Sequence, residues 1–117
     1  MIRTRLNVSK IIYTSDRVTQ LYHLTSLTVL LSSITSLPDS IGQLTKLTHL
    51  TISLNDLTSQ PDSKGQLTQL SYLNISHNNL TSLPDSIGQL TKLTHLHISW
   101  NKTLRSLPDS IGQLTKL

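Results

Sequence analysis

The sequence SLPDSIGQLTKLTHL occupies residues 36–50 and returns letter for letter at residues 82–96. A third copy, SLPDSIGQLTKL, occupies residues 106–117. Repetition on this scale predicts a stack of like structural units, each of which buries its apolar side chains against its neighbours. At 117 residues, the chain is expected to form a single domain.

The leucines set the period of the repeat. Leu21, Leu44, Leu67 and Leu90 follow one another at intervals of 23 residues, and Leu114 follows after 24 because one residue is inserted. The pattern of one unit is L-x-x-L-x-x-L-x-I-x-x-N-x-L-x-x-L-P-x-x-I-G-Q. One slot holds asparagine in three units and serine in the first, at Ser32, Asn55, Asn78 and Asn101.

This combination of leucine spacing, asparagine slot and period resembles the leucine-rich repeat family over residues 21–117, as four full units and a partial fifth. The LPxxIGxL half of the unit is similar to the intracellular Ras-group subclass of these repeats. The resemblance implies an α/β solenoid, a right-handed superhelix with a parallel sheet on its concave face. Short helical or extended segments are then expected on the convex face.

The residues themselves predict the same architecture. Residues 50–52 (LTI) and 73–75 (LNI) alternate with period two, which is typical of a strand with one buried face. The repeated asparagine is expected to bind backbone groups of the adjoining turn and so to form a ladder through the stack. The proline of each unit is expected to end the strand segment, and the Asp-Ser that follows to cap a helical turn. In each unit, a glycine stands two residues before the leucine that sets the repeat period. This glycine is expected to mark a turn back toward the next strand.

Residues 1–20 are predicted to be an eroded repeat that acts as an N-terminal cap. Residues 15–21 (SDRVTQL) align with PDSIGQL, and Leu6 aligns with Val29. The alternative is a disordered basic tail up to about Lys10. Four basic residues and one acidic residue give residues 1–20 a net charge of +3, whereas six basic and five acidic residues give the remainder +1. Most of the excess positive charge therefore lies in residues 1–20. No nucleic-acid partner is expected.

Two further features depart from the regular pattern. Gln60 replaces the leucine before the proline of one unit, and Lys64 replaces the isoleucine before Gly65. The two readings are neutral decay with the lysine reaching solvent, and a local opening for a partner. Leu117 falls in the middle of a unit, so Leu96, Ile98 and Leu114 are expected to lie uncovered. Three interpretations of this uncovered end are that the natural chain is longer, that the end self-associates, and that the last turn is frayed.

Function is expected on the strand face, where side chains alternate with the buried leucines. Serines 53, 76 and 99 are expected to form one of its exposed rows. Trp100 is the predicted anchor, because tryptophan and tyrosine are enriched at interface centres; the alternative is that it only covers the next unit. The predicted partner-binding residues are His49, Tyr72, Asn74, His77, His95, His97 and Trp100.

No catalytic residue, metal site or cofactor is expected. The sequence places no paired carboxylates in one neighbourhood and contains no glycine-rich phosphate loop. His95 and His97 share a face, but His49 lies two strands away, roughly twice the ~4.8 Å interstrand spacing. No cysteine or nearby aspartate completes a zinc shell around them. A pH-dependent interface is the favoured interpretation of the histidines.

The chain has no cysteine, and no apolar run long enough for a signal peptide or a membrane span. A cytoplasmic location and no membrane partner are therefore expected. The predicted function is a protein–protein interaction module that binds another protein as a scaffold or adaptor. The alternatives are the ligand-recognition segment of a larger receptor, resistance protein or signalling enzyme, and an unselected product of recent duplication.

Overall fold

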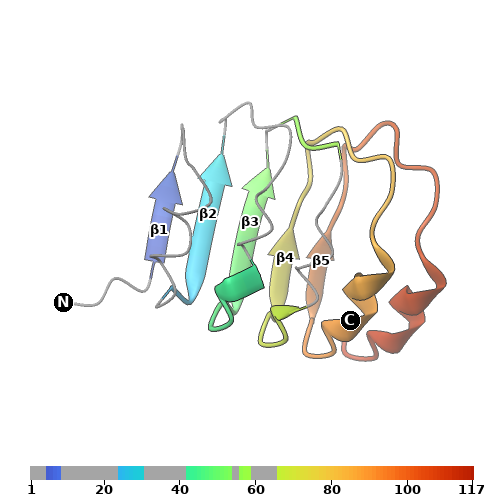
Figure 1. Cartoon of the computed structure of the whole chain (residues 1–117). Coiled ribbons are helices and arrows are strands. Elements are labelled where there is room, and N and C mark those ends of the chain that lie inside the picture. The colour runs from blue at the N-terminus through green and yellow to red at the C-terminus, as the bar shows by residue number, and fades with distance from the viewer. Residues whose placement is uncertain (1–4, 9–23, 31–41, 54–55, 59–65) are drawn as a thin grey trace.

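The computed structural model describes residues 5–8, 24–30, 42–53, 56–58 and 66–117, so Gln60 and Lys64 lie outside the described residues. In this part of the chain, five strands form one parallel sheet in sequence order (Figure 1). The strands are β1 (Arg5–Val8), β2 (Ser26–Leu30), β3 (His49–Ser53), β4 (Tyr72–Asn74) and β5 (His95–His97). The sheet forms one face of a solenoid. The predicted fold class is therefore confirmed.

The pairing of β2 to β5 follows the repeat period. Leu27 pairs with Leu50, Leu50 with Leu73, and Leu73 with Leu96, so each unit places the same slot beside its neighbour. The pairing of β1 differs, because Leu6 pairs with Leu27 and not with Val29. The expected alignment of Leu6 is therefore wrong. A shift of two residues keeps the same side chains on the same face, so the apolar pattern alone does not fix this register.

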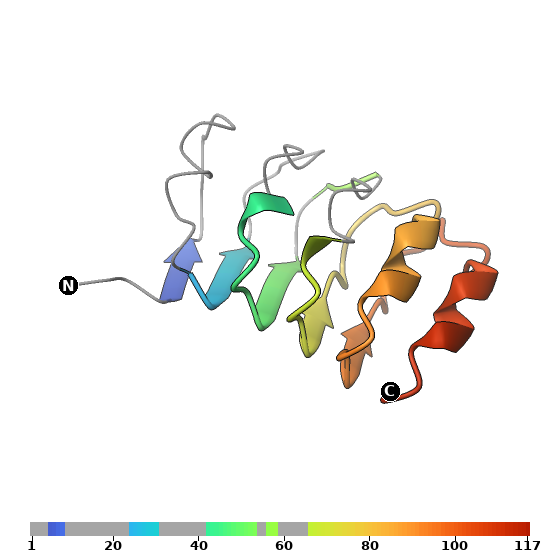
Figure 2. The same cartoon turned by 60° about the horizontal axis from the view of Figure 1, so that its bottom comes forward.

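Short 3-10 segments form the opposite side of the stack at its C-terminal end. These are η3 (Asp85–Gln89) and η4 (Asp109–Gln113), which lie side by side away from the strands (Figure 2). Pro84 occupies the N-cap of η3 with φ −70° and ψ 152°, without a side-chain cap bond, and Asp85 lies inside the first turn. The expected cap by Asp-Ser is therefore wrong. The segment begins earlier, because proline at the boundary has the fixed φ that the turn needs.

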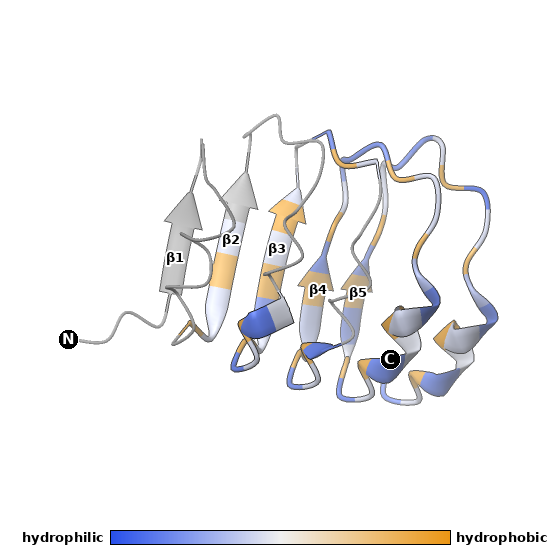
Figure 3. Ribbon diagram, viewed as in Figure 1, coloured by the Kyte–Doolittle hydropathy of each residue, from blue (hydrophilic) through white to orange (hydrophobic). Residues whose placement is uncertain are grey.

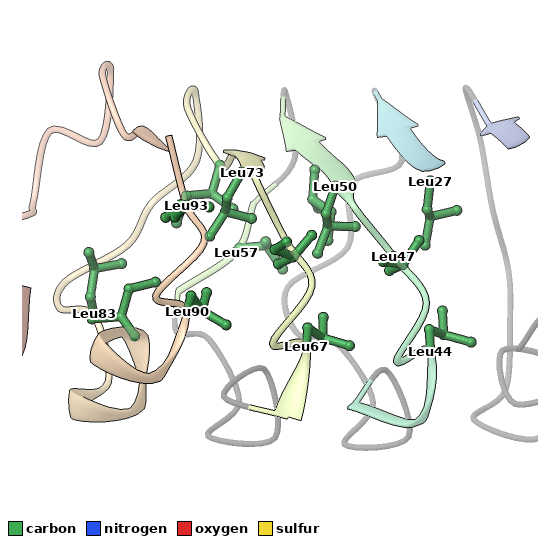
Figure 4. Packing of buried hydrophobic residues seen from close by; sticks show 14 of the residues in the cluster. Leu27, Leu44, Leu47, Leu50, Leu57, Leu67, Leu73, Leu83, Leu90 and Leu93 are labelled. Atoms are coloured by element: carbon green, nitrogen blue, oxygen red, sulfur yellow. The ribbon is translucent and has the colours of Figure 1, made fainter. Parts of the chain in front are cut away.

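The core lies between the sheet and the outer segments. Apolar residues recur at the same place in successive units (Figure 3), and their side chains form one continuous cluster (Figure 4). Removing one leucine of this kind from water contributes roughly 1.5–3 kcal/mol. The side chains with no exposed surface include Leu44, Leu47, Leu50, Leu67, Leu70, Leu73, Leu90 and Leu93.

The asparagine ladder is confirmed at two consecutive units. Asn78 Nδ2 donates to the carbonyl oxygens of Ile52 at 2.8 Å and Ile75 at 2.9 Å, and its Oδ1 accepts from the backbone N–H of Leu57 at 3.3 Å. Asn101 repeats the arrangement one unit later, with Nδ2 donating to Ile75 O at 3.1 Å. Each amide therefore joins its own turn to the preceding unit. Asn55 lies outside the described residues.

Gly88 is required by close packing and not by a turn. A Cβ placed on Gly88 would lie 2.8 Å from both the Cβ and the carbonyl oxygen of Ser110, which belongs to η4. Among the described residues no glycine has a positive φ. The expected turning role is therefore wrong for Gly88. Gly112, the equivalent residue of the last unit, has no atom within 4 Å of such a Cβ.

The last unit presents an apolar end. Leu107 is 45% exposed and Leu117 53% exposed, whereas Leu83 and Leu93, their counterparts one unit earlier, are 5% and 0% exposed. Leu96 and Ile98 are half-buried, as their uncovered position predicts. Leu114, however, is only 4% exposed, because the preceding unit alone covers this slot. Its expected exposure is therefore wrong.

Candidate functional site

Four rings of the strand face lie together. Parallel pairing places His49 beside Tyr72 and Tyr72 beside His95, so one slot of three successive strands carries a ring. The ring centroids lie 5.7 Å apart for His49 and Tyr72 and 5.9 Å apart for Tyr72 and His95. His97 is two residues further along β5, and its ring centroid lies 5.3 Å from that of Tyr72 and 6.4 Å from that of His95. We call His49, Tyr72, His95 and His97 the ring cluster.

Asn74 lies in the row next to Tyr72, opposite His97. Its Oδ1 accepts hydrogen bonds from the backbone N–H of Ser76 at 3.0 Å and from Ser76 Oγ at 2.6 Å. These bonds orient the side-chain amide. Ser76 itself is only 7% exposed, as is Ser53, so the expected exposed row of serines is wrong for these two residues and holds only for Ser99.

His77 and Trp100 form a second group, the corner pair. Both lie beyond their strands, one residue before the ladder asparagine of their unit. Their φ angles are 56° and 57°, in the left-handed region that disfavours bulky residues. The two rings stack with centroids 5.7 Å apart and an interplanar angle of 14°. Trp100 nevertheless remains 66% exposed.

Hydroxyl groups beside two rings of the cluster also belong to the site, although the sequence reasoning did not single them out. Thr48 Oγ1 lies 2.9 Å from His49 Nδ1, and Thr94 Oγ1 lies 3.0 Å from His95 Nδ1. The signal was the Thr-His pair at residues 48–49 and 94–95, which recurs in the duplicated segment. These contacts set the orientation of two of the four rings.

The arrangement offers recognition groups, with few charges. The ring cluster, Asn74 and the corner pair present aromatic faces, ring nitrogens, a phenol and an amide, and they contain no carboxylate, lysine or arginine. Within the described residues, no group of three or more His, Cys, Asp or Glu side chains could hold a metal ion. No helix in the same part of the chain combines the length and apolar character needed to cross a membrane.

Family models described as leucine-rich repeat match residues 58–102 and 92–114. A solved leucine-rich repeat protein of Leptospira interrogans is 36% identical, with a TM-score of 0.82, over 97% of this chain and 28% of that one. The functional domain of InlJ from Listeria monocytogenes, which includes a cysteine ladder, is 29% identical with a TM-score of 0.78, over 97% of this chain and 24% of that one. The chain thus spans about a quarter of the length of these two structures. No curated protein gives a significant match.

Proposed function

Because the chain belongs to the leucine-rich repeat family, whose folds commonly serve as protein-interaction modules, we propose that it binds another protein through its strand face. In this proposal it acts as a scaffold or adaptor and not as an enzyme. The observation that carries the proposal is the exposed Trp100 beside the strand face, stacked on His77.

The backbone conformation at Trp100 supports a recognition role for the indole. A left-handed φ costs a residue with a side chain roughly 1–2 kcal/mol, and asparagine or glycine would occupy this corner more easily. A 66% exposed side chain recovers little by burial, so packing within this chain does not account for the indole. Tryptophan is the residue type that most often dominates binding energy at interfaces. Trp100 therefore supports the anchor role over a purely covering role.

The ring cluster extends the proposed surface across β3, β4 and β5. Tyr72 contacts three imidazole rings, which hold its ring in one place before a partner arrives. Preorganised aromatic side chains lose little conformational entropy on binding. Asn74, oriented by Ser76, adds a polar group beside them. We assign the proposed contact to these residues together with the corner pair.

A peptide-display selection on the wild-type chain tests the proposal. Peptides that bind are measured again on Trp100→Ala and on Tyr72→Ala. The matched control is Lys92→Ala, which changes an exposed side chain that donates to Gln69 Oε1 at 2.8 Å and belongs neither to the ring cluster nor to the corner pair. Loss of an interface anchor typically costs 2 kcal/mol or more, about thirtyfold in affinity.

The expected result is that most selected peptides weaken on Trp100→Ala and Tyr72→Ala and keep their affinity on Lys92→Ala. Trp100 is the only tryptophan of the chain, so its fluorescence should shift to shorter wavelength when these peptides bind. Peptides that keep full affinity for both strand-face variants and lose it with Lys92→Ala would move the binding surface elsewhere and overturn the proposal.

The apolar end favours a second candidate role, in which the repeats are the recognition segment of a larger assembly. In this alternative, the exposed Leu107 and Leu117 would contact another repeat unit, which belongs to a receptor, a resistance protein, a signalling enzyme or a second copy of this chain. A reducing, cytoplasmic setting is also part of the proposal, because the 117 residues contain no cysteine.

A further inference from the structure

Strand pairing places one arginine and three histidines in two neighbouring rows of the sheet. We call them the face rows, and their members are Arg5, Ser26, His49, Tyr72 and His95 in the first and Asn7, Thr28, Thr51, Asn74 and His97 in the second. The register of β1 decides the place of Arg5, because an offset of 23 residues would have put it beside Thr28. Residues two apart on a strand share a face, so both rows belong to one side of the sheet.

The carboxylates of the described residues belong to other parts of the fold. They are Asp56, Asp85 and Asp109. Asp85 and Asp109 lie in η3 and η4, on the side opposite the strands (Figure 2). Asp56 follows the last residue of β3 by three positions. The face rows therefore contain one permanently cationic residue type and three imidazoles, but no acidic residue.

Apart from Asp56, the charged residues in the described segments next to the face rows are also basic. Lys46 and Lys92 stand in the turns that precede β3 and β5. Between β4 and η3, and between β5 and η4, the titratable or charged residues are His77, Lys102 and Arg105. Water and salt screen each exposed lysine, so one of them alone contributes little. What matters is that these segments add no further carboxylate to compensate positive charge on the face rows.

The three imidazoles lie close together and open to solvent. His49 and His95 flank Tyr72 with ring centroids at 5.7 Å and 5.9 Å, and the centroids of His95 and His97 are 6.4 Å apart. All three histidine side chains are exposed. Histidine gains its positive charge as the pH falls from about 8 to about 5, whichever ring nitrogen carries the proton of the neutral form. Like charges at this separation repel, and an anion bound across them offsets the repulsion.

We propose that the face rows bind a protein segment rich in aspartate or glutamate, and that they bind it more tightly as the pH falls. The face rows belong to the proposed contact surface, so this assignment rests on the proposed function and adds the chemistry of the partner. Charge complementarity supports it, because the rows gain positive charge on acidification and hold no carboxylate. The histidines alone predicted a pH-dependent interface without a direction, and the positions of the carboxylates supply the direction.

The test selects peptides from one display library on the wild-type chain at about pH 5.5 and at about pH 7.5, on either side of the histidine transition. The most enriched peptide is compared with a copy in which asparagine or glutamine replaces each aspartate or glutamate. Peptide carboxylates titrate near pH ~4, so they stay ionised in both selections. We expect acidic residues to be enriched at the lower pH. Binding should then be about tenfold tighter than at the higher pH, the contribution of one charge-assisted hydrogen bond, and the amide copy should show no such gain.

Two variants assign the effect to the face rows. The triple variant His49→Gln, His95→Gln and His97→Gln removes the imidazoles but keeps polar side chains, so affinity should no longer depend on pH. Asp85→Asn is the matched control, because it raises the net charge by one on the opposite side and should leave the affinity at both pH values unchanged. Circular dichroism at both pH values checks that the variants are folded, and the amide copy of the peptide tests the charge without altering the protein.

Selected peptides without enriched acidic residues would overturn the acidic partner, as would a pH dependence that persists in the triple variant. If those peptides still weaken on Trp100→Ala and Tyr72→Ala, the proposed contact surface stands and only the partner chemistry is wrong. Peptides that bind all of these variants as tightly as the wild-type chain would overturn both.

Discussion

Trp100 combines high exposure with an unfavourable backbone angle. At φ 57° a large side chain is costly, and at 66% exposure it regains little by burial. His77 repeats the angle at φ 56° and supplies the stacking partner. A stack of two rings contributes about 0.5–1.5 kcal/mol, which is less than the roughly 2–4 kcal/mol that two left-handed residues cost together. At the scale of the residue, the corner pair is therefore a net cost to folding, and its exposed indole is available for binding.

The first prediction concerns Trp100→Asn. Asparagine tolerates the left-handed region, so the relief of the backbone cost offsets the lost ring stack, and the free energy of unfolding should change by less than about 0.5 kcal/mol. Urea denaturation followed by circular dichroism measures it. A loss well above 1 kcal/mol would identify Trp100 as a structural residue that covers its neighbours.

The second prediction compares two adjacent asparagines. Asn78→Ala removes a buried amide. The N–H of Leu57 and the carbonyls of Ile52 and Ile75 each lose their hydrogen bond to that amide. The chain should therefore lose about 2–4 kcal/mol of stability. Asn79→Ala, one residue along, changes an exposed side chain and should cost less than about 0.5 kcal/mol. Equal effects in denaturant melts would show that the ladder does not hold the units together.

The residue scale also shows what the sequence could predict. The leucine slots and the buried asparagines Asn78 and Asn101 were predictable, because each recurs at a fixed interval and each has one physical use. The left-handed corner at His77 and Trp100 was not, because no glycine or Asn-Gly pair marks it. The asparagine that follows each of them bonds to the preceding unit, and these bonds are visible only when the units are stacked.

At the scale of the element, neighbouring units touch along two lines. The strands pair on one side, and η3 packs against η4 on the other (Figure 2). The contact between the strands of neighbouring units was predictable from the period-two alternation of apolar residues. The packing of the outer segments was not, because the close approach of Gly88 to Ser110 depends on the distance between the outer segments of two consecutive units. The cap at Asp85 was misplaced for a local reason, because Pro84 occupies the boundary with the fixed φ that the turn needs.

The third prediction uses the two equivalent glycines of these segments. Gly88→Ala forces a methyl group against Ser110, including its backbone oxygen at 2.8 Å, and should cost about 1–3 kcal/mol. Gly112→Ala meets open space at an ordinary φ and should stabilise the chain by about 0.4–1 kcal/mol. Thermal melts of both variants measure the difference. If Gly112→Ala were as destabilising as Gly88→Ala, another unit would be packed against η4 in solution.

At the scale of the molecule, the stack is continuous but its two ends differ. β1 joins the sheet with a 21-residue offset, from Leu6 to Leu27, whereas the later strands keep 23, from Leu27 to Leu50. The division of the chain at residue 20 falls outside the described residues and stays a prediction. The C-terminal end presents Leu107 and Leu117, and the sequence predicted an apolar end there from the mid-unit position of Leu117.

The fourth prediction addresses that apolar end. If it mediates self-association, the solution mass measured by light scattering should rise with protein concentration. The double variant Leu107→Lys with Leu117→Lys should remain monomeric, because two charges cannot be buried between copies. Thr91→Lys adds charge to an exposed residue of the preceding unit and should associate like the wild type. A wild-type chain that is monomeric at every concentration would contradict self-association.

We propose that the strand face, with Trp100 beside it, is the recognition surface of the stack. Hydroxyl-radical footprinting of the chain with and without a peptide selected by display tests this most directly, because the radical labels exposed tryptophan, tyrosine and histidine side chains. We expect protection at Trp100, Tyr72, His95 and His97. Protection confined to the opposite side, at Asp85–Gln89 and Asp109–Gln113, would contradict it.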